Sequence, residues 1–144
     1  MTLESANKAI EAYCEALETA GVETVRRLLE LCAADIEFKD PFNHTHSRDG
    51  YERVLRHMFK QVRNLRFQVH WKRGEGRDWV IGWTFSGEVN VIGRINVDGL
   101  SEISFDDDLK VVRHIDHWDA WASIYCRIPV LGALFRLMSR PMRI

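Results

Sequence analysis

The spacing of apolar residues divides the chain into a helical first part and a strand-rich remainder. Between residues 4 and 20, and again between 22 and 29, apolar residues recur every three or four positions, which predicts two helices. Ile36 and Phe38 mark a brief strand that ends before Pro41. A third helix is expected after Ser47, because serine is a favoured residue at a helix N-terminus.

After Asn64 the apolar positions recur at every second residue, which is the period of a strand. Four strands are expected, at about 65–71, 79–85, 95–105 and 109–118. Helices followed by consecutive strands indicate an α+β fold. We expect a cone-shaped, curved antiparallel sheet with three N-terminal helices on its concave face and a mostly apolar pocket at its open mouth.

Composition narrows the possible functions. The 144 residues suit one domain with one core, and a net charge of -1 gives no reason to expect nucleic acid as a partner. Three cysteines without metal-ligand spacing indicate reduced thiols and a cytoplasmic protein. The N-terminus lacks the pattern of a signal peptide, and no apolar stretch has the length of a bilayer span.

Three short segments, together with the order of the elements, resemble a known superfamily. The segments are Phe38-Lys39-Asp40-Pro41-Phe42, Phe105-Asp106 and His117-Trp118-Asp119. They resemble the nuclear transport factor 2-like superfamily, and within it the bacterial SnoaL-like proteins and the relatives of ketosteroid isomerase. The resemblance covers about residues 4–119. We therefore expect a SnoaL-like domain over residues 1–119 and a C-terminal helical extension of that domain over 120–144.

The resemblance implies acid–base chemistry without a cofactor, of the isomerase or polyketide cyclase type. Asp40 matches the general base of the isomerases, and Tyr13 can match their tyrosine oxyanion donor. Ser101 stands where the isomerases have a protonated acid, so steroid-type isomerisation is a weaker fit. Asp40 has an alternative role, since aspartate in a turn commonly accepts hydrogen bonds from nearby backbone amides.

A second constellation lies on the last predicted strand. His114, Asp116 and Trp118 alternate, so they share one face of the sheet. The resemblance implies that Trp118 faces the pocket, which would place His114 and Asp116 there as an acid–base pair. The alternative is a buried structural pair, in which His114 and Asp116 hydrogen-bond to each other inside the core. No metal site is expected, because His114 and His117 differ in parity and face opposite sides.

The remaining predicted ligand contacts are aromatic or hydroxyl-bearing residues, and each has packing as its alternative role. They are Tyr13, Phe42, Phe59, Trp83, Ser101 and Trp118. The predicted function is binding of a small hydrophobic molecule, with isomerisation or cyclisation as its possible chemistry. The alternative is a non-catalytic ligand-binding or dimerisation module. Homodimerisation through the outer face of the sheet is implied by the resemblance.

The C-terminal extension combines apolar residues with arginines. Pro129 is expected to open a short helix at Val130. Docking of this helix on the domain or on a dimer partner is the preferred interpretation. Association of a basic amphipathic helix with an anionic membrane surface, through which the protein would be membrane-peripheral, is the alternative.

Overall fold

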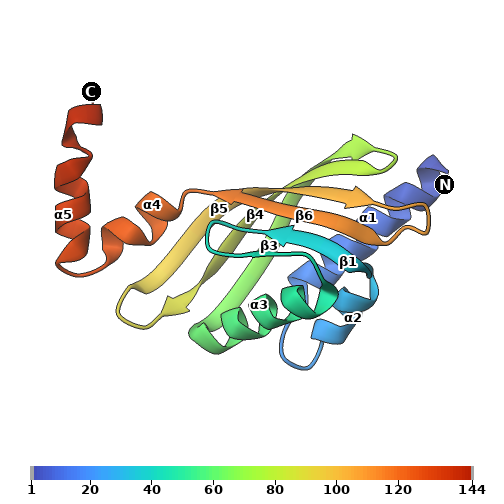
Figure 1. Cartoon of the computed structure of the whole chain (residues 1–144), viewed down its shortest axis with the longest axis horizontal. Helices are drawn as coiled ribbons and strands as arrows, with labels where there is room; N and C mark the ends of the chain where they lie inside the picture. The colour runs from blue at the N-terminus through green and yellow to red at the C-terminus, as the bar shows by residue number, and fades with distance from the viewer. Residues whose placement is uncertain (1, 144) are drawn as a thin grey trace.

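The computed structural model describes residues 2–143, so Met1 and Ile144, the outermost residues of the two predicted segments, lie outside it. The fold is α+β, with a curved, unclosed sheet of six strands (Figure 1). Its helices are α1 Leu3–Glu18, α2 Val25–Glu30, α3 Arg48–Gln61, α4 Ala120–Ser123 and α5 Leu131–Met138, with short 3-10 turns η1 Tyr125–Arg127 and η2 Arg140–Met142. Its strands are β1 Cys32–Lys39, β2 His44–Thr45, β3 Val62–Glu75, β4 Asp78–Val89, β5 Gly93–Phe105 and β6 Val111–Trp118.

The strands are ordered β2-β1-β6-β5-β4-β3. Strands β3 to β6 form an antiparallel meander, as the alternating pattern predicts. The expectation of a wholly antiparallel sheet is wrong at one pair, because β1 runs parallel to β6. These two strands are far apart in the sequence, so no hairpin fixes their relative direction.

The core lies between the inner face of the sheet and the first three helices. Apolar side chains of α1, α2 and α3, such as Ile10, Leu28 and Leu55, pack in one cluster with inner-face residues such as Ile81 and Ile103. Burial of these apolar surfaces is the main stabilising contribution to the fold. It also keeps Ser101 and His114, two polar side chains of the inner face, away from water.

The segment between β1 and α3 contains a short strand, β2, that the sequence pattern does not predict. Asp40 begins a tight turn, and His44–Thr45 then pair antiparallel with Lys39 and Phe38. The N-terminus of α3 is capped as expected, because Ser47 Oγ accepts a hydrogen bond from the amide of Gly50 at 3.0 Å. The cap fixes where α3 starts and therefore how its apolar side meets the sheet.

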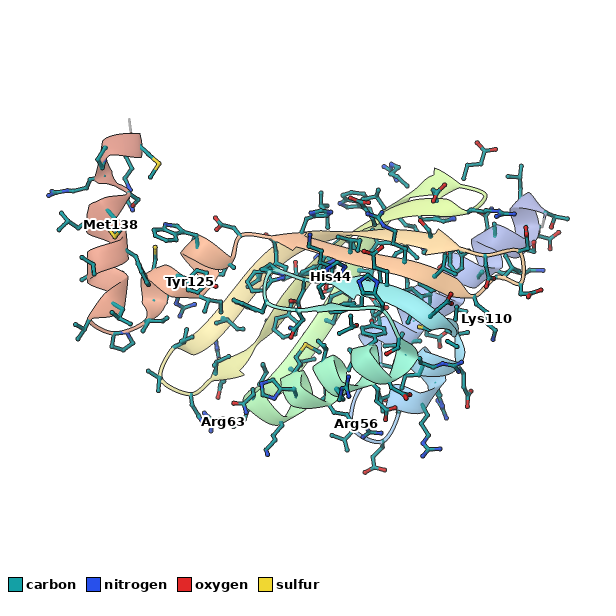
Figure 2. The ribbon with its side chains drawn as sticks, in the orientation of Figure 1. His44, Arg56, Arg63, Lys110, Tyr125 and Met138 are labelled. Carbon is teal, nitrogen blue, oxygen red and sulfur yellow. The ribbon has the colours of Figure 1, made fainter. Side chains whose placement is uncertain are left out.

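The C-terminal segment stands away from the domain (Figures 1 and 2). Helix α5 makes its main contacts with η1, and its Phe135 packs against Trp121 of α4 and Tyr125 of η1. The segment meets the domain near the end of β6, where the ring of Phe42 contacts Trp118 and Tyr125. Among residues 2–143, no helix combines the length and the apolar character that crossing a bilayer requires.

Candidate functional site

A buried polar network lies on the inner face of the sheet. Ser101 comes from β5, and it lies opposite Asp116 of β6 in the strand register. Asp116 Oδ1 is 2.8 Å from His114 Nε2 and also accepts a hydrogen bond from Ser101 Oγ. His114 is 3% exposed and Ser101 is 0% exposed, so both depend on protein partners for their hydrogen bonds.

The network continues into the helices. The hydroxyl of Tyr13, on α1, is 2.7 Å from His114 Nδ1. Tyr51, on α3, brings its hydroxyl to 3.4 Å from both His114 Nδ1 and the Tyr13 hydroxyl. Three elements that are distant in the sequence thus meet at one imidazole.

The partners fix the direction of each hydrogen bond when Asp116 is ionised. An ionised carboxylate only accepts, so His114 Nε2–H and Ser101 O–H both donate to it. In a neutral imidazole, His114 Nδ1 is then the acceptor for the Tyr13 hydroxyl. Ser101 Oγ in turn accepts the indole N–H of Trp83 at 2.7 Å. Each donor in this series of hydrogen bonds points toward Asp116. Hydrogen bonds arranged in this way strengthen one another.

Aromatic rings enclose the network. Phe38 stacks on Tyr51 with 4.5 Å between ring centroids and meets His114 edge-on at 5.3 Å. Burial raises the pKa of both Tyr13 and Tyr51 well above the usual value for tyrosine. The two phenols therefore stay protonated and act as hydrogen-bond donors at neutral pH.

Asp116 is the member of the network that meets solvent. Its side chain is 18% exposed, against 3% for His114. Within residues 2–143, its hydrogen bonds to His114 and Ser101 both end on Oδ1, and Oδ2 makes no side-chain hydrogen bond. Hydrogen bonds to one oxygen fix the orientation of the carboxylate and leave its other oxygen without a side-chain donor among these residues.

Asp40, the other predicted catalytic carboxylate, has a different environment. Its Oδ1 accepts hydrogen bonds from the amides of Phe42 at 2.7 Å and Asn43 at 2.6 Å. The side-chain amide of Asn43 reaches both carboxylate oxygens at 3.1 Å. In the described part of the chain, the hydrogen bonds of the Asp40 carboxylate thus lie within its own turn, which is the structural role that the sequence left open. Its catalytic role stays a prediction.

The predicted ligand contacts lie in three places. Trp83 is buried at the network, as are Tyr13 and Ser101. Trp118 is partly buried and follows Asp116 on the inner face, where it contacts the exposed ring of Phe42. Phe59 is partly buried on α3 against the core cluster. Whether these residues contact a ligand stays a prediction.

Sequence reasoning missed Tyr51 as a site residue. The helix α3 carries Tyr51 four residues before Leu55, and the two side chains share its buried side. This spacing marks Tyr51 as a core-facing residue. Its proximity to His114 depends on how α3 packs on the sheet, which the local pattern does not specify.

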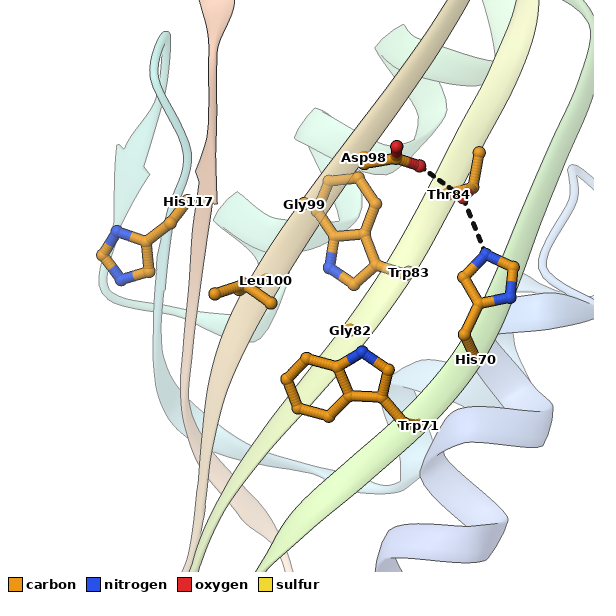
Figure 3. Close-up of a pocket in the computed structure, with 9 residues that line it drawn as sticks. All are labelled: His70, Trp71, Gly82, Trp83, Thr84, Asp98, Gly99, Leu100 and His117. Carbon is orange, nitrogen blue, oxygen red and sulfur yellow. Dashed lines mark hydrogen bonds between the residues drawn. The ribbon is translucent and has the colours of Figure 1, made fainter.

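A surface hollow, whose lining residues Figure 3 draws, lies on the other face of the sheet from Asp116. It has a volume of about 500 Å³ and is lined by His70, Trp71, Gly82, Trp83, Thr84, Asp98, Gly99, Leu100 and His117. In the register, Gly82, Leu100 and His117 are neighbours, and they alternate with the inner-face positions Ser101 and Asp116. This hollow is therefore not the predicted conical pocket, which stays a prediction.

The comparisons agree with the fold and place the chain in a family. A model of the SnoaL-like domain matches residues 10–114. The chain belongs to the SnoaL-like family. This membership confirms the resemblance to the nuclear transport factor 2-like superfamily that the sequence motifs indicate. No curated protein matches this SnoaL-like chain.

Solved structures share the fold at low sequence identity. A nuclear transport factor 2-like protein of unknown function from Burkholderia pseudomallei superposes with a TM-score of 0.72 at 16% identity, covering 90% of this chain and 100% of that one. An LEH-like epoxide hydrolase from M. tuberculosis gives 0.67 at 16% identity, covering 95% and 98%. A putative polyketide cyclase from Xanthomonas campestris gives 0.69 at 14% identity, covering 83% and 94%. At these identities the likeness shows the fold.

Proposed function

We propose that this SnoaL-like protein binds a small hydrophobic ketone and moves a proton at the carbon next to its carbonyl group, without a cofactor. The single observation that supports the proposal most directly is the network joining Tyr13, His114, Asp116 and Ser101. In it, His114 and Ser101 hydrogen-bond to the mostly buried carboxylate of Asp116, and Tyr13 reaches it through His114. Structural neighbours that include a putative polyketide cyclase fit this chemistry.

The proposed step begins when Asp116 Oδ2 takes a proton from the α-carbon of the ketone. The C–H electron pair moves into the new carbon–carbon double bond, and the carbonyl oxygen becomes an enolate. Return of the same proton to a different carbon completes an isomerisation, so atoms and charge balance. His114, hydrogen-bonded to Oδ1, would hold the carboxylate in place. It would also adjust its own hydrogen bond when Asp116 takes up the proton and loses its negative charge.

Deuterium exchange tests this proposal without knowledge of the natural substrate. The protein is incubated in D2O with 2-tetralone, a hydrophobic ketone with exchangeable α-protons, and mass spectrometry follows the uptake of deuterium. We expect exchange above the uncatalysed rate, and we expect Asp116→Asn to lower it by about 10²-fold or more, which is the usual contribution of a general base. A thermal-shift titration with the same ketone would show that the variant still binds.

Asp40→Asn is the matched carboxylate control. Loss of exchange in Asp40→Asn alone would transfer the role of base to Asp40 and contradict the proposal. Binding of 2-tetralone without exchange in any variant would instead support the alternative, a non-catalytic ligand-binding module. A failure of the wild-type protein both to bind and to exchange the ketone would overturn the ketone as substrate class.

We also propose that a second copy of the chain covers the outer face of the sheet. Trp71 and Leu100 are 41% and 42% exposed there, beside the hollow of Figure 3. Apolar side chains exposed around one concave surface are typical of an interface between proteins. Measurement of the mass in solution tests this proposal.

A second candidate role is association with an anionic membrane surface through α5. Beyond Asp119 the chain contains four arginines and no acidic residue. The apolar side chains exposed in this segment include Leu131, Leu134, Leu137, Met138 and Met142 (Figure 2 labels Met138). A short helix with leucines on one side and arginines nearby suits the boundary of an anionic bilayer. Flotation with vesicles that contain phosphatidylserine tests this role.

A further inference from the structure

Two histidines and a glutamate meet on the outer face of the sheet, outside the site described above. Glu37 lies on β1, and His44 begins β2. Glu37, His44 and His46 each offer one potential ligand atom, and these atoms all lie within 4.8 Å of one another. His44 Nε2 is 2.9 Å from Glu37 Oε1, and the two imidazole centroids are 4.5 Å apart.

The strand register explains why these three residues meet. Lys39 pairs with His44 and Phe38 pairs with Thr45, so the same antiparallel register places residue 46 opposite residue 37. His44 and His46 are two positions apart and therefore point to the same face. The sequence alone does not reveal this site, because β2 has two residues and leaves no periodic pattern.

We propose that Glu37, His44 and His46 bind a divalent transition-metal ion of the Zn²⁺ type. Two imidazoles and one carboxylate are a common donor set for zinc and other first-row metals, with water completing the coordination. The cluster is partly exposed, so an ion and its water ligands can reach it from solvent.

A neighbouring arginine already orients the carboxylate. Arg113 Nε lies 3.5 Å from Glu37 Oε2, and Arg113 is itself paired with Glu102 of β5. Glu37 thus presents Oε1 to the histidines while Arg113 contacts Oε2. Carboxylate ligands of metal sites commonly have such a second partner. The hydrogen bond from His44, followed by the charge of Arg113, lowers the pKa of Glu37.

The positive charge of Arg113 opposes the metal, and the charge of Glu102 compensates it. Arg113 shares its guanidinium between Glu37 and Glu102, so the three groups together carry one negative charge at neutral pH. The site differs from the pair formed by His117 and Glu102 on the same face. That pair has a similar separation of 2.8 Å, but among the described residues it has no second imidazole close enough to supply a third ligand atom.

Isothermal titration with ZnCl2 tests the proposal on the full-length, tag-free protein after treatment with a chelator. We expect one saturable site, and we expect His44→Ala and His46→Ala each to weaken binding at least about tenfold. Titration with CoCl2 gives an independent readout, because the visible absorption of bound Co²⁺ reports nitrogen and oxygen coordination. Circular dichroism would show that each variant remains folded.

His117→Ala is the matched control, since it removes a histidine paired with a glutamate on the same face. It should leave zinc affinity and the cobalt spectrum unchanged. Three results would overturn the proposal: no saturable zinc binding by the wild-type protein, unchanged affinity in a folded His46→Ala variant, or an equal loss in His117→Ala. His46→Ala is the most informative variant, because the hydrogen bond between His44 and Glu37 stays intact in it.

Discussion

At the scale of single residues, two tyrosines contact the same imidazole at different distances. Tyr13 approaches His114 Nδ1 to 2.7 Å, whereas Tyr51 stops at 3.4 Å. The shorter distance is that of a well-formed hydrogen bond, and the longer one lies beyond the usual range for a hydroxyl donor. We therefore expect the two phenol groups to contribute unequally to stability, although both are almost fully buried.

The matched variants Tyr13→Phe and Tyr51→Phe test this difference. Tyr13→Phe leaves a buried acceptor without its short hydrogen bond and should lower the free energy of unfolding by about 1–2 kcal/mol. Tyr51→Phe removes only long contacts and should cost clearly less. Urea unfolding followed by tryptophan fluorescence measures both. Equal costs, or a larger cost for Tyr51→Phe, would contradict the assignment of Tyr13 as the main partner of His114.

Part of the candidate site can be predicted from local rules. Alternation along one strand is enough to place His114 with Asp116, because strand period is a property of the backbone. Asp40 illustrates the limit of such reasoning. The Asp-Pro sequence is compatible with a catalytic base and with a turn cap, and only the positions of the Phe42 and Asn43 amides show where the carboxylate is bound.

At the scale of elements, two glycines allow tryptophans to lie flat across neighbouring strands. Trp83 of β4 covers Gly99 of β5 on the inner face, and Trp71 of β3 covers Gly82 of β4 on the outer face. A Cβ atom at either glycine would overlap the indole above it. The two indoles differ in freedom, because Trp83 is 5% exposed and tethered to Ser101, whereas Trp71 is 41% exposed.

Alanine at these two positions should therefore have unequal effects. Gly99→Ala must displace an indole that is packed and hydrogen-bonded, which should cost about 1–3 kcal/mol, as overpacking of a core usually does. Gly82→Ala should cost less, since Trp71 can turn toward solvent. Chemical unfolding measures the free energies, and a shift of the fluorescence maximum in Gly99→Ala would report the moved Trp83. A greater loss in Gly82→Ala would show that Trp71 is held in place, for instance by a second copy of the chain.

The helices and strands could be predicted from the sequence where their hydrophobic pattern extends over many residues. The strands β3 to β6 carry sustained alternation, and α1 and α3 carry helical spacing, so their existence follows from the sequence. Strand β2 is too short for any period to show. The parallel pairing of β1 with β6 was not predictable for another reason, since it is a contact between segments separated by most of the chain.

At the scale of the whole molecule, two exposed apolar surfaces lie on different parts of the protein. One is the outer face of the sheet around Leu100, and the other is the side of α5 that carries Leu134. Their surroundings differ in charge. Two histidines and the carboxylate of Asp98 border the first surface, whereas the residues after Asp119 carry arginine as their only ionised side chains. We propose different partners for them, a second copy of the chain and an anionic membrane.

The same substitution at the two leucines separates these partners. Leu100 is 42% exposed and Leu134 is 50% exposed, so glutamate at either position should leave the fold intact. In an interface, however, the new carboxylate would be buried without a partner, which is costly. Light scattering should give the wild-type protein and Leu134→Glu about twice the 16.8 kDa of one chain, and Leu100→Glu the mass of one chain. A wild-type protein with the mass of one chain would refute the dimer, and loss of the dimer in Leu134→Glu would place α5 in the interface between copies.

Flotation of the same two variants tests the membrane role of α5. Flotation with vesicles that contain phosphatidylserine should be lost in Leu134→Glu and kept in Leu100→Glu. The reason is that a carboxylate on the inserted side of α5 opposes both burial in the bilayer and attraction to anionic lipid. Equal flotation of Leu134→Glu and the wild type would therefore refute the membrane role of α5. A loss of flotation in Leu100→Glu alone would show that the outer face of the sheet, and not α5, contacts the lipid.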